Sequence, residues 1–294
     1  MGAFEWCTLN VNLIDEVYAL LNKIIERMSI TESLTYSTVL IKCTYADGTQ
    51  GSGTGFVINL CRNSDSCLPV VITNNHVVDD AVEIVFGFCK ADDTGAPLDR
   101  EQIWIKCDLA SWKHHPDSNV DLQCFPLVGL LKELDSKQIR FFYVPLGTEL
   151  IPPKKDLDEL SAMEDVVMFG YPNGISDEYN HKPVIRRGIT ATHPKNDYQG
   201  KKEILLDIPA FPGSSGSPVF ILNQGSFATS NGIALGNRIF LLGVLRAGPM
   251  FNAAGNLSFS NVPVLPTPVT QIPMNLGVII KSEKILDFET LFPK

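Results

Sequence analysis

The chain has 294 residues, of which 45% are hydrophobic and 19% charged, and its formal net charge is −9 with a pI of about 5.1. These proportions are ordinary for a globular protein that buries a sizeable core. The acidic balance argues against a nucleic-acid partner or an acidic membrane surface, and no apolar run reaches the ~20 residues that a membrane span needs.

Residues 11–29 are expected to form an amphipathic helix, which either packs on the domain behind it or binds a partner. Apolar residues recur there at helical spacing: Leu13, Val17, Leu20, Leu21, Ile24, Ile25 and Met28. The segment does not resemble a secretory signal peptide, because it lacks a basic start and Asp15 and Glu16 interrupt its apolar pattern. We therefore expect a cytoplasmic protein.

The number and spacing of the cysteines indicate a protein of a reducing compartment. They are an odd number, seven: Cys7, Cys43, Cys61, Cys67, Cys89, Cys107 and Cys124. Only Cys61 and Cys67, which flank a polar turn, are spaced for a local disulfide, and in a cytoplasm we expect both to be thiols. No CxxC pair is present, so we expect no structural zinc site, and nothing in the sequence indicates a cofactor.

From about residue 36 the apolar pattern changes from helical spacing to alternation. STVLIKCTYADGTQGSGTGFVINL alternates on both sides of Asp47-Gly48, which predicts a β-hairpin. Further strands are predicted at LPVVITNNHVV, AVEIVFGFCKA, QIWIKCDLASW and VDLQCFPLV. The more polar segment 132–165 follows, and we expect a domain boundary near its end.

The second part of the chain repeats this style. Strands are predicted at VVMFGYP, PVIRRGITATH, KEILLDIPA, GSPVFILN and RIFLLGVLRAG, and a Pro- and Asn-rich loop is expected at 249–275. NLGVIIKSEKILDFETLF predicts a last strand and a short terminal helix with Ser282 as its N-cap. Many short strands at regular spacing indicate an all-β fold built of sandwiches or barrels.

The stretch PAFPGSSGSPVF, residues 209–220, carries the candidate nucleophile. Ser215 lies between Ser214 and Gly216, and Gly213 stands two residues before it. Glycine permits a positive φ and lets a substrate approach the backbone, and a hydrolytic serine also needs N–H groups that converge on the oxyanion. Such a stretch is by itself equally typical of an ordinary polar loop.

A nucleophilic serine needs a base, and the base needs an acid that orients it. His76 lies where an apolar strand ends, in TNNHVV. Asp121 stands at the start of another apolar strand, where a carboxylate is costly unless paired, although a cap at the strand start remains open. The other histidines are expected on the surface or in turns: His114, His115, His181 and His193.

Seven segments, in the correct order, resemble the chymotrypsin-type serine proteases, and in style the HtrA family and the staphylococcal glutamyl endopeptidases. GSGTGFVI resembles their first hairpin, TNNHVV their T-x-x-H-V, and NVDLQCFPL their D-[IVL]-A-[VL]. VVMFGYPNG and PVIRRGITAT resemble the segments that open the second barrel, and LDIPAFPGSSGSPVF resembles the stretch around the nucleophile. NLGVIIKSEKI resembles the terminal strand and helix, so that the resemblance covers roughly residues 36–290.

The resemblance implies an all-β, chymotrypsin-like fold of two six-stranded antiparallel β-barrels, with the site between them. It implies an N-terminal helical extension at 1–35, a first barrel at 36–155, and a second barrel with a short C-terminal helix at 156–294. His76 would act as general base and then general acid, Asp121 would orient it, and Ser215 would be the nucleophile. Residues Gly213, Ser214 and Ser215 would form the oxyanion hole, with the N–H groups of Gly213 and Ser215 as donors.

The residues near the candidate nucleophile differ from those that control activation and substrate specificity in the families that the chain resembles. Digestive proteases have an Asp before the nucleophile, and here that position is Ser214, so we expect no activation by insertion of a new N-terminus. Ala210 replaces the Thr of glutamyl endopeptidases, which argues against a glutamyl preference. Arg246 either favours an acidic group or is a surface residue. Substrate contacts, for a small or medium apolar residue before the cut, are expected from Pro209, Ala210, Phe211, Leu245, Arg246 and Ala247.

Three functions follow from these residues. The first is an active serine endopeptidase that acts on a protein or peptide, as a regulated cytoplasmic bacterial protease. The second is a catalytically silent peptide-binding module on the same fold. The third, a cysteine-type hydrolase, lacks a cysteine flanked by glycines. The N-terminal helix and the 249–275 loop are the candidate sites for a regulatory partner.

Overall fold

The computed structural model describes residues 28–60, 67–229, 232–248, 250–254 and 269–292. The helix predicted at 11–29 therefore lies outside the described residues, apart from its last two. The first described element is a short helix, α2 (Ile30–Ser37), which begins after Ser29. The Ser29 hydroxyl accepts a hydrogen bond from the Glu32 amide at 3.2 Å, which caps the free N–H groups of the first turn.

The first half of the described chain is one sheet of nine strands, here called the N-terminal sheet. Its main path runs in the order β5-β4-β1-β2-β3-β7-β6, while β8 pairs with β4 and β9 pairs with β2. The predicted hairpin around Asp47-Gly48 is confirmed as β1 and β2, which pair from Thr38 with Phe56 onward. The strands are β1 (Thr38–Tyr45), β2 (Gln50–Leu60), β3 (Leu68–Thr73), β4 (Ala81–Ala91), β5 (Pro97–Lys106), β6 (Lys113–His114), β7 (Gln123–Pro126), β8 (Phe141–Phe142) and β9 (Leu146–Gly147).

The second half forms a closed barrel of six strands, here called the C-terminal barrel, in the order β10-β11-β12-β19-β16-β13. All of its strand pairs are antiparallel, and they include the five strands predicted from alternation. The strands are β10 (Asp165–Gly170), β11 (Val184–Thr190), β12 (Glu203–Asp207), β13 (Pro218–Asn223), β16 (Arg238–Ala247) and β19 (Leu276–Lys281).

The expectation of two closed barrels is met for the second half only. Within the described residues the N-terminal sheet ends at β5 on one side and at β6 on the other, and these two strands do not pair. A physical reason lies in the segment between them. The chain leaves β5 at Lys106, turns through the 3₁₀ helix η1 (Leu109–Ser111), and returns as a β6 of only two residues.

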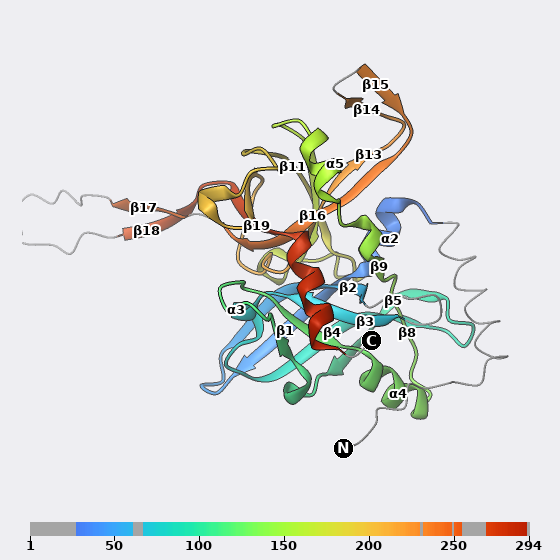
Figure 1. Ribbon diagram of the computed structural model, residues 1–294. Coiled ribbons are helices and arrows are strands. Elements are labelled where there is room, and N and C mark those ends of the chain that lie inside the picture. The colour runs from blue at the N-terminus through green and yellow to red at the C-terminus, as the bar shows by residue number, and fades with distance from the viewer. Residues whose placement is uncertain (1–27, 61–66, 230–231, 249, 255–268, 293–294) are drawn as a thin grey trace, which may run out of the picture.

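Two hairpins extend away from the C-terminal barrel (Figure 1). One pairs β14 (Ser226–Thr229) with β15 (Gly232–Leu235), and the other pairs β17 (Met250–Ala254) with β18 (Val269–Pro273). The second hairpin falls in the segment 249–275, for which the sequence predicts a loop. That prediction is wrong at both ends of the segment, because the two ends pair with each other as antiparallel strands.

The remaining helices are short, and all except η5, which follows the last strand, lie between strands. They are α3 (Asn75–Val78), α4 (Val128–Ser136) and α5 (Lys154–Glu159), with the 3₁₀ helices η1, η2 (Thr148–Leu150), η3 (Pro172–Gly174), η4 (Tyr198–Gly200) and η5 (Ser282–Leu291). The predicted terminal helix is confirmed as η5, although its N-cap is Lys281 and Ser282 is its first residue. None of the helices within the described ranges has both the length and the apolar character that a bilayer crossing requires.

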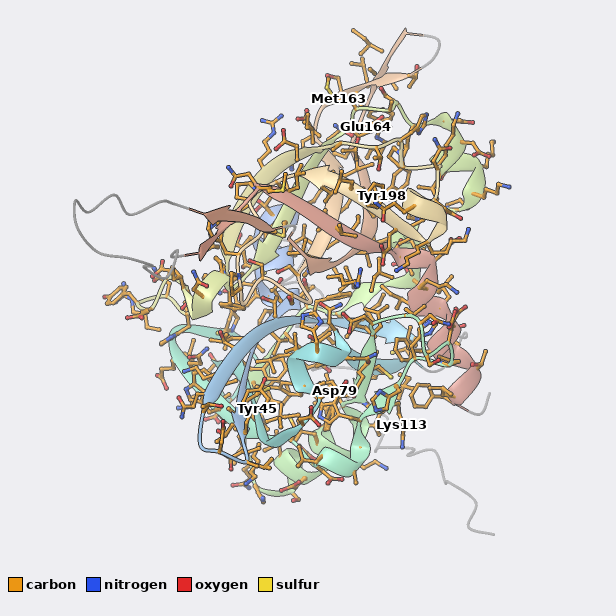
Figure 2. All side chains as sticks on the ribbon, turned by 90° about the vertical axis from the view of Figure 1, so that its left-hand side faces the viewer. Tyr45, Asp79, Lys113, Met163, Glu164 and Tyr198 are labelled. Atoms are coloured by element: carbon orange, nitrogen blue, oxygen red, sulfur yellow. The ribbon has the colours of Figure 1, made fainter. Side chains whose placement is uncertain are left out.

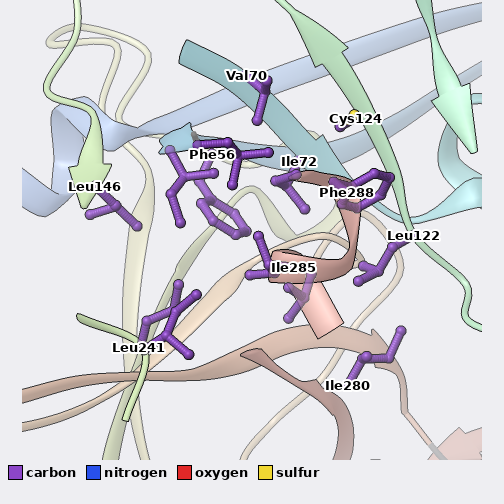
Figure 3. Packing of buried hydrophobic residues seen from close by; sticks show 14 of the residues in the cluster. Phe56, Val70, Ile72, Leu122, Cys124, Leu146, Leu241, Ile280, Ile285 and Phe288 are labelled. Atoms are coloured by element: carbon purple, nitrogen blue, oxygen red, sulfur yellow. The ribbon is translucent and has the colours of Figure 1, made fainter. Parts of the chain in front are cut away.

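One apolar core joins the two halves. Phe56 and Ile72 of the N-terminal sheet belong to the same buried cluster as Leu241 of the barrel and Phe288 of η5 (Figure 3). The helix η5 leaves the barrel after β19 and contacts β2 of the sheet (Figure 1). Figure 2 shows the halves from another side, with Asp79 labelled at the end of α3. Because burial of apolar side chains is the main stabilising term, the two halves hold each other in place.

His115 corrects an expectation from the sequence, which placed it on the surface. The residue is only 4% exposed, and its ring lies edge-on to Phe288 at a centroid distance of 5.2 Å. Nδ1 accepts from the Asp117 amide at 3.0 Å, so that Nε2 carries the proton and donates to the Lys284 carbonyl at 2.9 Å. The ring therefore attaches η5 to the N-terminal sheet.

Candidate active site

His76 and Asp121 meet beside the neighbouring ends of β3 and β7. The chain leaves β3 at Thr73 and turns into the single-turn helix α3, which carries His76 with its side chain half exposed. Its Nδ1 lies 2.6 Å from Asp121 Oδ2, and its backbone N–H donates to Asp121 Oδ1 at 3.2 Å. Asn74 Nδ2 in turn donates to the Asp121 carbonyl at 2.8 Å. The hydrogen bond to the carboxylate thus favours the tautomer with the proton on Nδ1, which leaves Nε2 as an acceptor.

Ser215 reaches the same place from the C-terminal barrel. A cleft of about 570 Å³ is lined by residues of both halves, among them His76, Asp121 and Ser215. The Ser215 hydroxyl donates to the Arg246 carbonyl at 3.3 Å, and within the described residues it makes no hydrogen bond to His76. The three candidate residues therefore share one cleft, with the serine hydroxyl turned toward β16.

The residues before Ser215 form a tight turn that requires glycine. The Ser214 amide donates to the Phe211 carbonyl at 3.0 Å, with Pro212 and then Gly213 at the two central positions. Gly213 has a φ of +85°, so this is the type II turn, which favours proline first and glycine second. A Cβ on Gly213 would lie 2.6 Å from the Tyr171 carbonyl oxygen. Both backbone angle and space therefore exclude other residues here.

The orientation of the peptide bond between Pro212 and Gly213 is fixed by η3. The Pro212 carbonyl accepts a hydrogen bond from the Asn173 amide. In a trans peptide the N–H points opposite to the C=O, so the Gly213 N–H is directed away from Asn173. The Ser214 amide is used inside the turn, whereas no acceptor is found in the described part of the chain for the amides of Gly213 and Ser215.

Ser214 occupies a fully buried position before the nucleophile. Its side chain is 0% exposed, and its hydroxyl has no hydrogen-bond partner among the described residues. A buried, uncharged group offers no partner for a new N-terminal ammonium. The absence of activation by N-terminal insertion stays a prediction.

The walls of the cleft contain only part of the predicted substrate-contact set. Ala210, Phe211 and Arg246 line it, whereas Pro209 does not. Leu245 corrects the prediction, because its side chain is 1% exposed and packs in the barrel core. Its backbone N–H and C=O are also bonded to Ser217 and Gly216. Whether the Ala247 side chain lines the cleft stays a prediction, because the structure describes only the backbone of this residue.

Sequence reasoning missed several residues of this cleft. Asn75 and Asp79 line it on the sheet side, and Pro212 and Gly248 line it on the barrel side. The two sheet residues flank His76 at −1 and +3, so their position next to it on one helical turn was the available signal. Arg186 does not line the cleft, but its guanidinium lies 5.0 Å from the ring centroid of Phe211, which does. These two residues are too far apart in the sequence for a local pattern to predict their contact.

Arg246 already has acidic partners within the protein. Its Nη1 lies 3.1 Å from Glu203 Oε1, and its Nε lies 3.8 Å from Asp121 Oδ2. The guanidinium is therefore neutralised by two carboxylates, which disfavours its use to select an acidic substrate.

Three described cysteines, Cys43, Cys89 and Cys124, are poor nucleophiles in this fold. Burial raises the pKa of the Cys43 and Cys89 thiols to about 11 and that of Cys124 to about 12. Since the thiolate is the reactive form, these groups are inert near neutral pH. No described cysteine lines the cleft.

The candidate pair Cys61 and Cys67 cannot be compared with the structure, because Cys61 is outside the described residues. No three His, Cys, Asp or Glu side chains gather as a metal site among the residues described.

Residues 53–228 match a family model described as a trypsin-like peptidase domain. The chain belongs to this family. The prediction of a trypsin-like serine protease is thereby confirmed at the level of the family, and the matched range includes all three candidate residues. No curated protein matches the chain.

Two solved structures are similar to this trypsin-like peptidase. An HtrA-type protease, AlgW with a tripeptide, is 15% identical with a TM-score of 0.45, covering 92% of this chain and 62% of that one. The Rv3671c protease from M. tuberculosis, in its active form, is 13% identical with a TM-score of 0.42, covering 97% of this chain and 90% of that one. The chain thus spans less than two thirds of the AlgW chain.

Proposed function

We propose that the protein is a serine endopeptidase that cleaves peptide bonds through an acyl-enzyme on Ser215. One observation carries the proposal. His76 and Asp121 from the N-terminal sheet and Ser215 from the C-terminal barrel line a single cleft, with His76 Nδ1 only 2.6 Å from Asp121 Oδ2. A nucleophile, a base and a carboxylate that fixes the tautomer of the base are the groups that acyl transfer needs.

In the first half-reaction Ser215 Oγ attacks the carbonyl carbon of the scissile bond while His76 Nε2 takes its proton. Asp121 stabilises the imidazolium that forms, and the N–H groups of Gly213 and Ser215 donate to the oxyanion. The imidazolium then gives its proton to the leaving amine, the C–N bond breaks, and the acyl group stays on Ser215. Water repeats these steps in deacylation, with His76 again as base and then acid.

The resting position of the Ser215 hydroxyl, which donates to the Arg246 carbonyl, is compatible with this role. Catalytic hydrogen bonds in proteins without substrate are often long or misaligned and tighten in the complex. We propose that a rotation about the Cα–Cβ bond of Ser215 brings the hydroxyl to His76 when substrate binds. Such a rotation passes between staggered rotamers and needs no backbone movement.

An extended peptide would bind along the residues that follow Leu245 in β16, as an added strand. The side chain before the cut would enter between the turn at Ala210–Pro212 and Gly248. A Cβ on Gly248 would lie 2.9 Å from the Ala210 carbonyl oxygen, so these walls approach each other closely. The proposal therefore includes a small or medium apolar residue before the cut.

We also propose that the chain divides into two β domains, with the boundary between residues 155 and 156. So does control by a partner at the N-terminal helix or at 249–275, which fall mostly outside the described residues. The competing function is a silent peptide-binding module, for which the serine position would have no reactivity.

Labelling with a fluorophosphonate–rhodamine probe tests the proposal. Wild type should be labelled, and Ser215→Ala and His76→Ala should not. Ser214→Ala is the matched control, because it removes a neighbouring hydroxyl that makes no hydrogen bond in the described structure. Labelling that survives Ser215→Ala, or is lost in Ser214→Ala alone, would show that the nucleophile is misassigned. No labelling of wild type would favour the binding module.

A further inference from the structure

Every backbone carbonyl from Phe211 to Ser215 has a hydrogen-bond donor. The Phe211 carbonyl accepts from the Ser214 amide, the Pro212 carbonyl from Asn173, and the Ser214 carbonyl from the Ser217 amide. The two remaining carbonyls, those of Gly213 and Ser215, both accept from Thr54. One residue of the N-terminal sheet thus supplies two of the five bonds that orient this part of the C-terminal barrel.

Thr54 lies in the middle of β2 and is fully buried. Its hydroxyl donates to the Gly213 carbonyl at 2.9 Å and accepts from the Tyr171 amide at 3.0 Å. Its backbone N–H donates to the Ser215 carbonyl at 2.9 Å. Its own carbonyl accepts from the Thr73 hydroxyl at 2.7 Å, so all of its polar groups are used.

Glycines allow the loop to approach Thr54 this closely. A Cβ on Gly216 would lie 1.8 Å from the Thr54 carbonyl oxygen, and a Cβ on Gly170 would lie 3.2 Å from its hydroxyl. A larger residue at Gly216 would push the loop away from β2. The close contact between Thr54 and the loop of Ser215 thus depends on glycines in the barrel as well as on the threonine in β2.

We infer that Thr54 is a positioning residue that holds the Gly213 and Ser215 N–H groups, the oxyanion hole of the proposed peptidase, in the orientation that this structure shows. Glycine has little intrinsic preference for one backbone conformation, so Gly213 keeps its N–H direction only if the peptides on both sides are fixed. The Asn173 amide bonds the carbonyl of the peptide before Gly213. The peptide after it is held at both ends, because its Gly213 carbonyl accepts from the Thr54 hydroxyl and its Ser214 N–H donates to the Phe211 carbonyl. The inference rests on the proposed function, because the hole matters only if Ser215 reacts.

The decisive variant is Thr54→Val. Valine keeps the β-branched shape and the backbone N–H that binds Ser215, but it cannot donate to Gly213 or accept from Tyr171. Thr54→Ser keeps the hydroxyl and serves as the conservative rescue. Both variants are compared with wild type for the rate of labelling by the fluorophosphonate at increasing probe concentration, which separates the limiting rate from the half-saturating concentration.

Thr190→Val is the matched structural control. The Thr190 hydroxyl is also buried, accepts from the Glu164 amide at 2.9 Å and donates to the Ala162 carbonyl at 2.8 Å. Each valine variant loses one donated and one accepted hydrogen bond of a buried hydroxyl. The partners of Thr190, however, do not belong to the turn before Ser215. Any general effect of a buried hydroxyl loss therefore shows in both, and thermal unfolding reports it.

Thr54→Val should lower the limiting labelling rate about ten- to hundredfold, because loss of one oxyanion donor costs roughly a hundredfold or more. The half-saturating concentration should stay within about twofold, and Thr54→Ser should retain the rate within about threefold. Thr190→Val should lose stability without losing rate. A Thr54→Val rate equal to wild type, or a loss shared with Thr190→Val, would overturn the inference while leaving the proposed function intact.

If wild type is not labelled, the proposed function fails and crystal structures of the same variants still test Thr54. The peptide between Gly213 and Ser214 should turn away in Thr54→Val and keep its orientation in Thr54→Ser. An unchanged peptide in Thr54→Val would refute the positioning role.

Discussion

Replacing Gly216 with alanine should disrupt the contact between the loop of Ser215 and β2. The φ of Gly216 is +87°, where alanine costs about 1–2 kcal/mol. The added Cβ would lie 1.8 Å from the Thr54 carbonyl oxygen, a distance that real Cβ atoms never show, and the obstacle is backbone that no rotamer change can move. Overpacking of this kind costs about a further 1–3 kcal/mol.

Gly225→Ala separates these two contributions. Gly225 has a φ of +86°, and a Cβ there would meet nothing within 4 Å, so this variant keeps the backbone strain and removes the clash. Differential scanning calorimetry should place Gly216→Ala about 2–12 °C below Gly225→Ala, at about 2–4 °C per kcal/mol. Because a shift of about 1 Å in a reacting group can cost a hundredfold in rate, labelling of Ser215 should also fall about a hundredfold in Gly216→Ala alone. Equal melting temperatures and equal labelling in the two variants would refute the reasoning.

Two further predictions concern stability. His115→Phe removes the hydrogen bond to the Lys284 carbonyl, so it should cost about 1–3 kcal/mol and raise hydrogen exchange in η5 first, measured by mass spectrometry; uniform exchange across the chain would contradict the attachment role. Burial raises the pKa of Asp99, but hydrogen bonds from Tyr36 and Lys182 outweigh it and hold the pKa below 3.8. The stabilisation by Asp99 is therefore complete above that value and lost as the pH falls through the lowered pKa. Asp99→Asn should flatten the loss of stability in urea unfolding from about pH 6 to about pH 3, and an unchanged slope would refute it.

The candidate site was predictable where its chemistry is local in sequence. Glycines on both sides of the serine pair indicate a turn with positive φ, and Gly213 and Gly216 have that conformation. A histidine at the end of an apolar strand and an aspartate at the start of another fit a base and the carboxylate that orients it. The hydrogen bond between His76 and Asp121 agrees with that interpretation, although 45 residues separate them.

The errors come from contacts that depend on distant parts of the chain. His115 looked exposed because its neighbours are polar, but the residue that buries it, Phe288, belongs to η5 at the other end of the sequence. Thr54 bonds a residue 159 positions away, and no pattern around it shows that. Such contacts follow from how the two halves pack, which local periodicity does not encode.

Leu245 is a different kind of error. Residues 241–245 are all buried, and the pairing of β16 with β19 is irregular between Leu245 and Ala247, so simple alternation of side chains does not predict which residues face the cleft. Arg246 lines the cleft, whereas Leu245 packs in the barrel core. The barrel itself was predictable because its short strands recur at regular spacing between turns, whereas closure of the N-terminal sheet depends on how far β6 reaches, which strand patterns do not specify.

The bond between Thr54 and Gly213 also has a consequence for the order of events during synthesis. Ribosomes add about 5–20 residues per second, so the 159 residues between the two positions take roughly 8–30 s to appear. During the later part of that time the nascent chain holds Thr54, His76 and Asp121, but the loop of Ser215 has not yet been made. An unfinished chain therefore carries no assembled hydrolytic centre, and the ability to cut is acquired only when the last part of the molecule has folded onto the first.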